Sequence, residues 1–211
     1  MHLAFIGVGQ VGAPLADQLQ RLGHDVVVAA RDPGSASVRK VLERNPRLRV
    51  TSPQEAVAGA EVVFLATPWE ATAAALEGVA GELEGKILID CTNPVGPNIS
   101  HGLNSERSGT EVIQTQVPGS RVVKAFTIYG FENFEHVACP DANLKPAMLY
   151  CGNDKTAKER VAPLIRALGW EPLDVGGLEQ ALHLEHMTLL WVRLVRVNGH
   201  SPHLVWAALQ R

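Results

Sequence analysis

Short apolar runs alternate with amphipathic segments from the first residues of the chain. The apolar runs have the length of buried strands and lie at Leu3–Ile6, Val26–Ala30, Glu61–Ala66, Lys86–Asp90, Arg121–Ala125, Ala147–Cys151 and Glu171–Asp174. Apolar residues recur at helical spacing in the segments between them, at Val11–Leu22, Ser35–Arg44, Pro53–Ala58, Trp69–Leu83 and Lys155–Leu168. This alternation predicts a doubly wound α/β fold, in which helices cover both faces of a parallel sheet.

Three stretches depart from this simple pattern. Leu178–Asn198 keeps near-helical spacing with no strand after it, and we expect a helical extension that packs on the sheet or on a second subunit. Cys91–Asn104 is rich in Pro, Gly, Asn and Ser, and irregular loops of this length in compact domains are usually functional. Pro163 falls inside a predicted helix and removes a backbone hydrogen bond, which predicts either a kink or two shorter helices.

Composition narrows the class of protein. The 211 residues are 46% hydrophobic and 19% charged, which is typical of a compact chain and not of a disordered one. The net charge of −3 gives no general reason to bind nucleic acid or a membrane. The three cysteines, Cys91, Cys139 and Cys151, lack metal-ligand spacing, and the chain has neither a signal-peptide pattern nor a membrane-length apolar run. We therefore expect a cytoplasmic protein with reduced thiols.

A glycine-rich segment directly follows the first predicted strand and opens the first predicted helix. It reads Gly7-Val8-Gly9-Gln10-Val11-Gly12, the G-x-G-x-x-G pattern of dinucleotide-binding loops. Gly7 permits the tight turn, Gly9 lets the backbone approach a pyrophosphate, and Gly12 lets the helix pack closely on the sheet. We expect a Rossmann-type NAD(P)-binding domain at 1–175 and a small helical extension at 176–211 within the same compact unit. The alternative is a glycine-rich turn that binds nothing.

The end of the second predicted strand favours NADP over NAD. An NAD-binding protein has an acidic residue there, whereas this chain has Ala30 and Arg31 before Asp32. The segment 31–50 has six basic and two acidic residues, a local net charge of +4. An arginine in this place can bind the 2′-phosphate of NADP. The alternative is a solvated helix face with Asp32 as the helix N-cap, and Asp32 leaves the use of NAD open.

Loops that follow three later strands should enclose the nicotinamide and a second flat ring. In doubly wound sheets ligands bind at the carboxyl ends of the strands. The candidate residues after these strands are Ala66, Thr67, Pro68, Trp69, Thr92, Asn93, Pro94, Phe126 and Thr127. For the aromatic rings of Trp69 and Phe126 the alternative is packing in the core.

The sequence shows no familiar set of catalytic or metal-binding residues. Cys91 is better explained by packing than as a nucleophile, and His183 and His186 are better explained at a surface or interface than as metal ligands. No lysine or histidine stands out as a general acid for reducing a carbonyl group. We therefore expect no metal and no certain catalytic residue, and we expect hydride transfer between two cofactor rings that the protein orients.

These segments together resemble the NADPH-dependent reductases of the deazaflavin coenzyme F420, and a similar domain occurs in the STEAP metalloreductases. The resemblance covers nearly the whole chain and rests on the glycine loop with Gly23-His24, Ala30-Arg31-Asp32-Pro33, Pro68-Trp69-Glu70, Asp90 with Thr92-Asn93-Pro94, Val123-Lys124-Ala125-Phe126, Cys151-Gly152-Asn153-Asp154, Leu173-Asp174-Val175-Gly176 and Leu184-Glu185. It implies an oxidoreductase that transfers hydride between the pro-S face of NADPH and a deazaflavin, or FMN, FAD or another acceptor, as a homodimer.

One departure from that family concerns the acceptor. Many relatives carry Asn after Lys-Ala-Phe, where this chain has Thr127, so the resemblance specifies NADP more firmly than the second ring. Imine and β-hydroxyacid reductases share a similar glycine loop, but they need a large helical second domain, and few residues follow Gly176 here. A second alternative is a redox sensor that binds NADPH without turnover. The physiological direction and the oligomeric state are not determined by the sequence.

Overall fold

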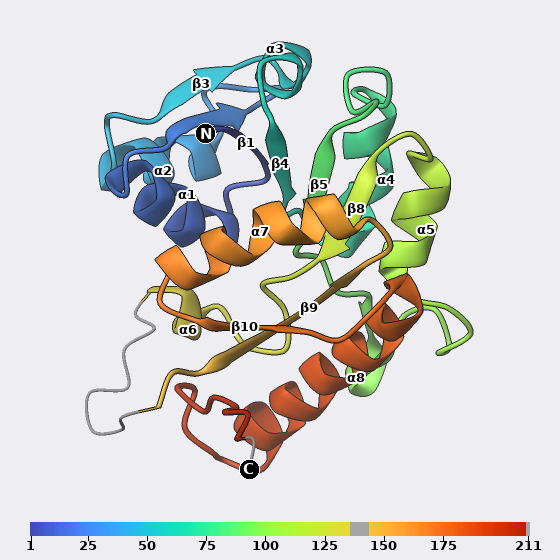
Figure 1. The fold of residues 1–211 in the computed structure, drawn as a ribbon. Helices are drawn as coiled ribbons and strands as arrows, with labels where there is room; N and C mark the ends of the chain where they lie inside the picture. The colour runs from blue at the N-terminus through green and yellow to red at the C-terminus, as the bar shows by residue number, and fades with distance from the viewer. Residues whose placement is uncertain (136–143, 210–211) are drawn as a thin grey trace.

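A single sheet organises the chain in this computed structural model, which describes residues 1–135 and 144–209. Within that part of the chain the sheet has eight strands in the order β10-β9-β8-β5-β4-β1-β2-β3 (Figure 1). The strands are β1 (His2–Ile6), β2 (Asp25–Ala29), β3 (Arg49–Thr51), β4 (Val62–Leu65), β5 (Ile87–Asp90), β8 (Arg121–Lys124), β9 (Ala147–Gly152) and β10 (Glu171–Asp174). From β1 the chain first adds β2 and β3 on one side and then crosses over to add β4 and the later strands on the other side. This reversal is typical of a doubly wound fold.

The register of the parallel strands brings their carboxyl ends into one row. Ile6 pairs with Ala29 on one side and with Leu65 on the other. Leu65 pairs with Asp90, and Asp90 pairs with Lys124. The loops that follow β1, β2, β4, β5 and β8 therefore leave the sheet side by side.

Helices cover both faces of the sheet, as the alternating pattern predicts. They are α1 (Gly12–Arg21), α2 (Ala36–Arg44), α3 (Pro53–Ala58), α4 (Trp69–Glu77), α5 (Gly109–Gln116), α6 (Glu132–Glu135), α7 (Lys155–Ala167) and α8 (Ala181–Val192). One core cluster joins the sheet to α1, α2, α7 and α8, and a second joins the opposite face to α3, α4 and α5. None of the helices in the described residues is long and apolar enough to cross a membrane.

The expectation of a wholly parallel sheet is wrong at one edge. β9 runs antiparallel to β8, with Val123 opposite Gly152, and β10 is parallel to β9. A parallel pair needs a crossover, usually a helix of several turns. The described part of the β8–β9 connection contains only the four-residue α6, whereas the long helix α7 follows β9 and joins it to β10.

Several boundaries also differ from the sequence expectations. The helix predicted at Trp69–Leu83 ends at Glu77, and the strand β3 and the helix α5 were not predicted. Pro163 lies inside the single helix α7, so the expectation of two shorter helices is wrong. The loop Cys91–Asn104 contains a short hairpin of β6 (Val95–Gly96) and β7 (Ser100–His101), joined by a 3-10 turn at Pro97–Ile99.

The C-terminal segment packs on the sheet. It starts with a 3-10 turn at Leu178–Gln180, continues as α8 and ends in a π-helical turn at Arg193–Val197. Trp191 of α8 is 1% exposed, and its indole N–H donates to the backbone oxygen of Leu204 at 2.8 Å. Ala147 N, at the start of β9, donates to Trp206 O at 2.8 Å. The tail after α8 is thus tied back to the sheet (Figure 1), while the domain boundary at 175/176 stays a prediction.

Candidate functional site

The glycine loop has the shape that a dinucleotide pyrophosphate requires. Gly7 has a φ of +96°, and a Cβ there would lie 2.6 Å from Ala66 O. A Cβ on Gly12 would lie 2.1 Å from Gly7 O, so only glycine lets α1 start this close to β1. A Cβ on Gly9, by contrast, would meet nothing within 4 Å. Gly9 therefore borders open space next to the start of α1, whose first N–H groups attract anions.

A pocket of about 280 Å³ lies beside this loop, where the adenosine half of a dinucleotide would be expected. Gly7, Val8, Ala30, Arg31 and Thr67 all line it, so the structure brings together residues from three separate predicted segments. Arg31 is exposed and forms no ion pair within the described residues. The pocket thus has a cation that is available to a ligand.

Two serines at the start of α2 also line this pocket, and sequence reasoning missed them. Ser35 is the N-cap of α2, yet its side chain caps no backbone N–H, and its hydroxyl lies 3.4 Å from that of Ser37. Hydroxyls at a helix start, shortly after a basic residue on the strand end, are the signal that could have identified them. With Arg31 they form a group of donors suited to a phosphate.

The rest of the basic segment 31–50 is largely occupied elsewhere. Arg44 bonds Asp17 at 2.9 Å and Glu135 at 2.6 Å, and Arg49 bonds Asp25 at 2.7 Å. Arg39 donates to the backbone oxygen of Gly34. The local charge of +4 therefore overstates the number of cations that face the pocket.

Asp32 does not act as the N-cap of α2, so that alternative is wrong. Its Oδ1 accepts a hydrogen bond from Gly34 N at 2.8 Å, which closes the turn before the helix. Ser35 is the N-cap instead. The carboxylate of Asp32 still lines the pocket beside Arg31, so this contact does not exclude a ribose hydroxyl as a ligand.

The two aromatic residues proposed for the ring pocket both pack against protein. Phe126 is 1% exposed, and its ring centroid lies 5.8 Å from that of Phe64 in the core. Trp69 is half-buried and packs on the start of α5, because a Cβ on Gly109 would lie 2.8 Å from its ring. The ring of Phe126 therefore packs in the core, as the alternative states, and only its backbone lies at the strand end.

A buried charge cluster lies directly behind the ends of β5 and β8. Lys124 Nζ bonds Asp90 Oδ2 at 3.1 Å, Glu185 Oε1 at 3.0 Å and Thr92 O at 2.9 Å. Glu185 also accepts from Gly109 N at 3.0 Å, at the start of α5. The side chains of Lys124, Asp90 and Glu185 are at most 1% exposed. This cluster ties α5 and α8 to the two strands.

The two carboxylates of the cluster stabilise the charged form of Lys124. Burial alone would lower the pKa of Lys124, but Asp90 and Glu185 outweigh it and raise that pKa above its usual value. His101 Nδ1 accepts from the backbone N–H groups of Leu103 and Ser105, each at 3.2 Å, so its proton lies on Nε2 and is donated to Glu185 at 2.8 Å. Lys124 and His101 were not recognised as partners from the sequence, because they come from distant segments.

The thiols in the described part of the chain are also unsuited to chemistry. Cys91 is buried, and burial followed by the charge of Asp90 raises the pKa of its thiol well above the usual value. Burial raises the pKa of Cys151 to about 12. These thiols stay protonated at neutral pH, as the packing interpretation of Cys91 requires. Cys139 lies outside the described residues.

The turn after β8 is strained and carries an unsatisfied hydroxyl. Phe126 and Ile128 have φ values of +55° and +64°, a left-handed conformation that costs a bulky residue about 1–3 kcal/mol. Between them, the Thr127 hydroxyl is buried and has no hydrogen-bond partner among the described residues. Strained turns and unpaired buried polar groups concentrate at ligand sites. These two features make the turn at residues 126–128 a candidate place for a bound ring, although its three residues are at most 1% exposed in this structure.

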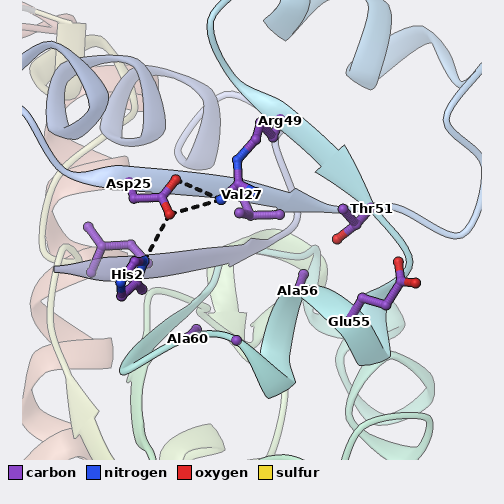
Figure 2. Close-up of a pocket in the computed structure, with 10 residues that line it drawn as sticks. His2, Asp25, Val27, Arg49, Thr51, Glu55, Ala56 and Ala60 are labelled. Atoms are coloured by element: carbon purple, nitrogen blue, oxygen red, sulfur yellow. Dashed lines mark hydrogen bonds and ion pairs between the residues drawn. The ribbon is translucent and has the colours of Figure 1, made fainter.

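One further pocket and two histidines are not part of the predicted dinucleotide site. A pocket of about 120 Å³ lies around the first residues of β1 and β2, where Asp25 bonds both His2 and Arg49 (Figure 2). It is far along the strands from the glycine loop and is not the predicted site. His183 and His186 are exposed, and His186 Nε2 lies 2.9 Å from Ser105 Oγ. In the described residues no group of three or more His, Cys, Asp or Glu side chains could hold a metal ion.

The fold and the glycine loop define a dinucleotide-binding protein of the Rossmann type. The family model described as NADP oxidoreductase coenzyme F420-dependent matches residues 2–94. The chain is 30% identical to the F420-dependent NADP reductase of Methanothermobacter thermautotrophicus, over 92% of this chain and 89% of that one. It therefore belongs to the F420-dependent NADP reductase family, whose members are NADP-dependent oxidoreductases.

Further relatives and structures support the same fold. The chain is 33% identical to the metalloreductase STEAP3 of Rattus norvegicus over 89% of its own length, but it spans only 36% of that protein. A solved structure of a protein from Arthrobacter sp. FB24, described as an F420-dependent NADP-reductase, matches with a TM-score of 0.82 and 30% identity over 94% of this chain and 95% of that one. An imine reductase from Aspergillus terreus matches at 18% identity with a TM-score of 0.67, which shows the fold alone.

Proposed function

We propose that this protein transfers hydride between NADPH and an acceptor ring, with the deazaflavin coenzyme F420 as the first candidate and a flavin or another electron acceptor as the second. The F420-dependent reductases that match nearly end to end support the first candidate. The metalloreductases match over about a third of their length and support the second. Family membership supports NADP as the hydride carrier in both cases.

The dinucleotide fits the residues at the strand ends. The open side of Gly9 and the N–H groups at the start of α1 would take the pyrophosphate. Arg31, Ser35 and Ser37 would take the 2′-phosphate, because they line one pocket and Arg31 has no acidic partner in the described residues. We assign the nicotinamide to Thr92-Asn93-Pro94 and to the turn at residues 126–128. Together these residues would hold the cofactor with its nicotinamide at the ends of β5 and β8.

The hydrogen bonds of the buried charge cluster are consistent with a mechanism that takes no proton from the protein. When bound, NADPH supplies two electrons and one proton as a hydride to the second ring. No proton from the protein is needed at the moment of transfer, and this agrees with the cluster, because all three Lys124 protons and the His101 proton are already donated to buried acceptors. The residues at this edge would therefore act by orienting the ring and excluding water.

Consumption of NADPH by the purified protein tests this function. Coenzyme F420, FMN, FAD and a ferric chelate are supplied in parallel, and NADPH absorbance is followed. Turnover with coenzyme F420 alone supports the first candidate, and turnover with flavin or ferric iron supports the second. NADPH binding without turnover on any acceptor would contradict the enzyme and favour a redox sensor. The cytoplasmic location, the homodimer and the division into a domain at 1–175 and an extension at 176–211 stay predictions.

A further inference from the structure

One hydroxyl from α8 joins the two loops that we assign to the nicotinamide. Thr188 Oγ1 accepts a hydrogen bond from Ile128 N at 3.0 Å, in the turn after β8. The same oxygen lies 3.0 Å from Asn93 Oδ1, in the loop after β5, and 3.1 Å from Leu184 O in its own helix. The side chain is buried, with Thr188 5% exposed. Thr188 thus fixes the backbone of one loop relative to a side chain of the other.

The Ile128 bond acts on the strained part of the turn. Ile128 has a φ of +64°, which a β-branched residue rarely adopts without support from its surroundings. The bond from its N–H to Thr188 supplies that support. The neighbouring Thr127 hydroxyl has no partner among residues 1–135 and 144–209. Release of the bond would let the turn relax toward an ordinary conformation and move Thr127.

The helix α8, which contains Thr188, is anchored to its neighbours by buried bonds. Glu185 lies three residues earlier on α8, so it faces the same side of the helix. Its carboxylate bonds Lys124 at 3.0 Å and Gly109 N at 3.0 Å, which anchors α8 to β8 and α5. Thr188 therefore connects Ile128 and Asn93 to a helix that Glu185 bonds to the sheet.

We propose that Thr188 is a positioning residue for hydride transfer, which sets the spacing between Asn93 and the turn at residues 126–128 and so the pose of the nicotinamide. This inference rests on the proposed function. Thr188 acts through the two loops and does not itself touch the ring. Loss of its hydroxyl should affect the geometry of transfer much more than the binding of NADPH, because we assign the phosphates and adenosine to the glycine loop and Arg31.

The test compares Thr188→Val with Thr188→Ser in the full-length protein. Valine keeps the shape and removes the hydroxyl with its contacts to Ile128, Asn93 and Leu184, whereas serine keeps the hydroxyl. Ser120→Ala is the matched control, because Ser120 is also 5% exposed and donates a buried bond to Val117 O at 2.9 Å, but lies before the first residue of β8. The readouts are the Kd for NADPH, the fluorescence of bound NADPH, kcat with the active acceptor, and the kinetic isotope effect with NADPH deuterated at C4.

Thr188→Val should lower kcat on the order of 10- to 100-fold, as misplaced reacting groups do, and should change the Kd for NADPH by less than about threefold. The isotope effect should rise as transfer becomes slower than the other steps. Thr188→Ser should restore kcat, and Ser120→Ala should leave kcat and the isotope effect unchanged even if it lowers the Tm.

Equal kcat and isotope effects in Thr188→Val and wild type would overturn the positioning role while leaving the proposed function intact. A fall in kcat that serine does not restore, or that Ser120→Ala reproduces, would also overturn it. If the wild-type protein binds NADPH but reduces no acceptor, the proposed function fails. The positioning role is then decided by the fluorescence of bound NADPH, which Thr188→Val should shift and Thr188→Ser should not.

Discussion

Lys124 and Glu185 form an ion pair of 3.0 Å whose side chains are fully buried. They lie on β8 and α8, which are far apart in the sequence. Asp90 on β5 forms a second ion pair with Lys124, at 3.1 Å. A buried pair of this kind adds little net stability when intact, but loss of one partner leaves an uncompensated charge. The residues behind the proposed nicotinamide site are therefore sensitive to any change in charge.

Lys124→Met should destabilise the protein by about 3–5 kcal/mol, because Asp90 and Glu185 would be left as two buried carboxylates without a cation. Urea unfolding followed by circular dichroism measures this loss. Lys155→Met is the control, since the Lys155 side chain is 88% exposed and lies 3.8 Å from Glu159, and it should leave the unfolding free energy nearly unchanged. Similar unfolding curves for the two variants would contradict the coupling within the cluster.

Gly9→Val should abolish dinucleotide binding while the protein stays folded. The new side chain would enter open space, so it should not disturb packing, but that space is where we place the pyrophosphate. Titration of NADPH by fluorescence measures the effect. Gly81→Val is the matched control, because a Cβ there also meets nothing within 4 Å and Gly81 lies between α4 and the start of β5, whereas the glycine loop follows the end of β1. Retained NADPH affinity in Gly9→Val would refute the pyrophosphate assignment.

Arg31→Ala should weaken NADPH binding by about 1.5–3 kcal/mol, the value of a hydrogen bond to a charged group. NADH lacks the 2′-phosphate, so its affinity should change much less. Calorimetry with both nucleotides gives the comparison. Arg47→Ala removes an exposed charge from the same basic segment and serves as the control for general electrostatics. If both nucleotides lose affinity equally in Arg31→Ala, the 2′-phosphate role is wrong.

Asp17→Asn should reduce stability at pH 7 by about 1–3 kcal/mol, because the carboxylate bonds Arg21, Arg44 and Asn45. Burial alone would raise the pKa of Asp17, but these bonds outweigh it and hold the pKa below its usual 3.8. The stabilisation is therefore present above about pH 4 and is lost as the pH falls through the lowered pKa.

Urea unfolding at several pH values tests this dependence. The difference between wild type and Asp17→Asn should shrink between roughly pH 5 and pH 2. Asp32→Asn is the control, since Asp32 is exposed and closes only a local turn, so its effect should be small at every pH. A difference for Asp17→Asn that stays constant down to pH 2 would contradict the ion-pair explanation.

Local patterns in the sequence predicted most of the strands and helices of the main fold and the glycine loop. The G-x-G-x-x-G segment, Arg31 and the loops after β4, β5 and β8 all lie at the row of strand ends that Ile6, Leu65 and Asp90 define. These features depend on neighbours in the chain, so periodicity and spacing reveal them.

Features that depend on distant segments were not visible. The cluster of Lys124, Glu185 and His101 needs β8, α8 and β7 to meet, and no periodicity reports such a meeting. Thr188 was missed for the same reason. The strand β9 was predicted, but its antiparallel direction was not, because a buried strand has the same sequence pattern in either direction. The core position of the Phe126 ring likewise depends on Phe64 of another strand.

The reversed direction of β9 shapes the space available to a ligand. Lys124 at the end of β8 pairs with Cys151 near the end of β9, so residues 147–150 of β9 extend past the row where the parallel strands stop, with β10 beside them. Figure 1 shows β9, β10 and α8 together below the end of β8. At its β8 end the row of strand ends is therefore bounded by β9 and β10. For a dinucleotide bound along this row from β2, as we propose, β9 and β10 would limit how far the nicotinamide can extend.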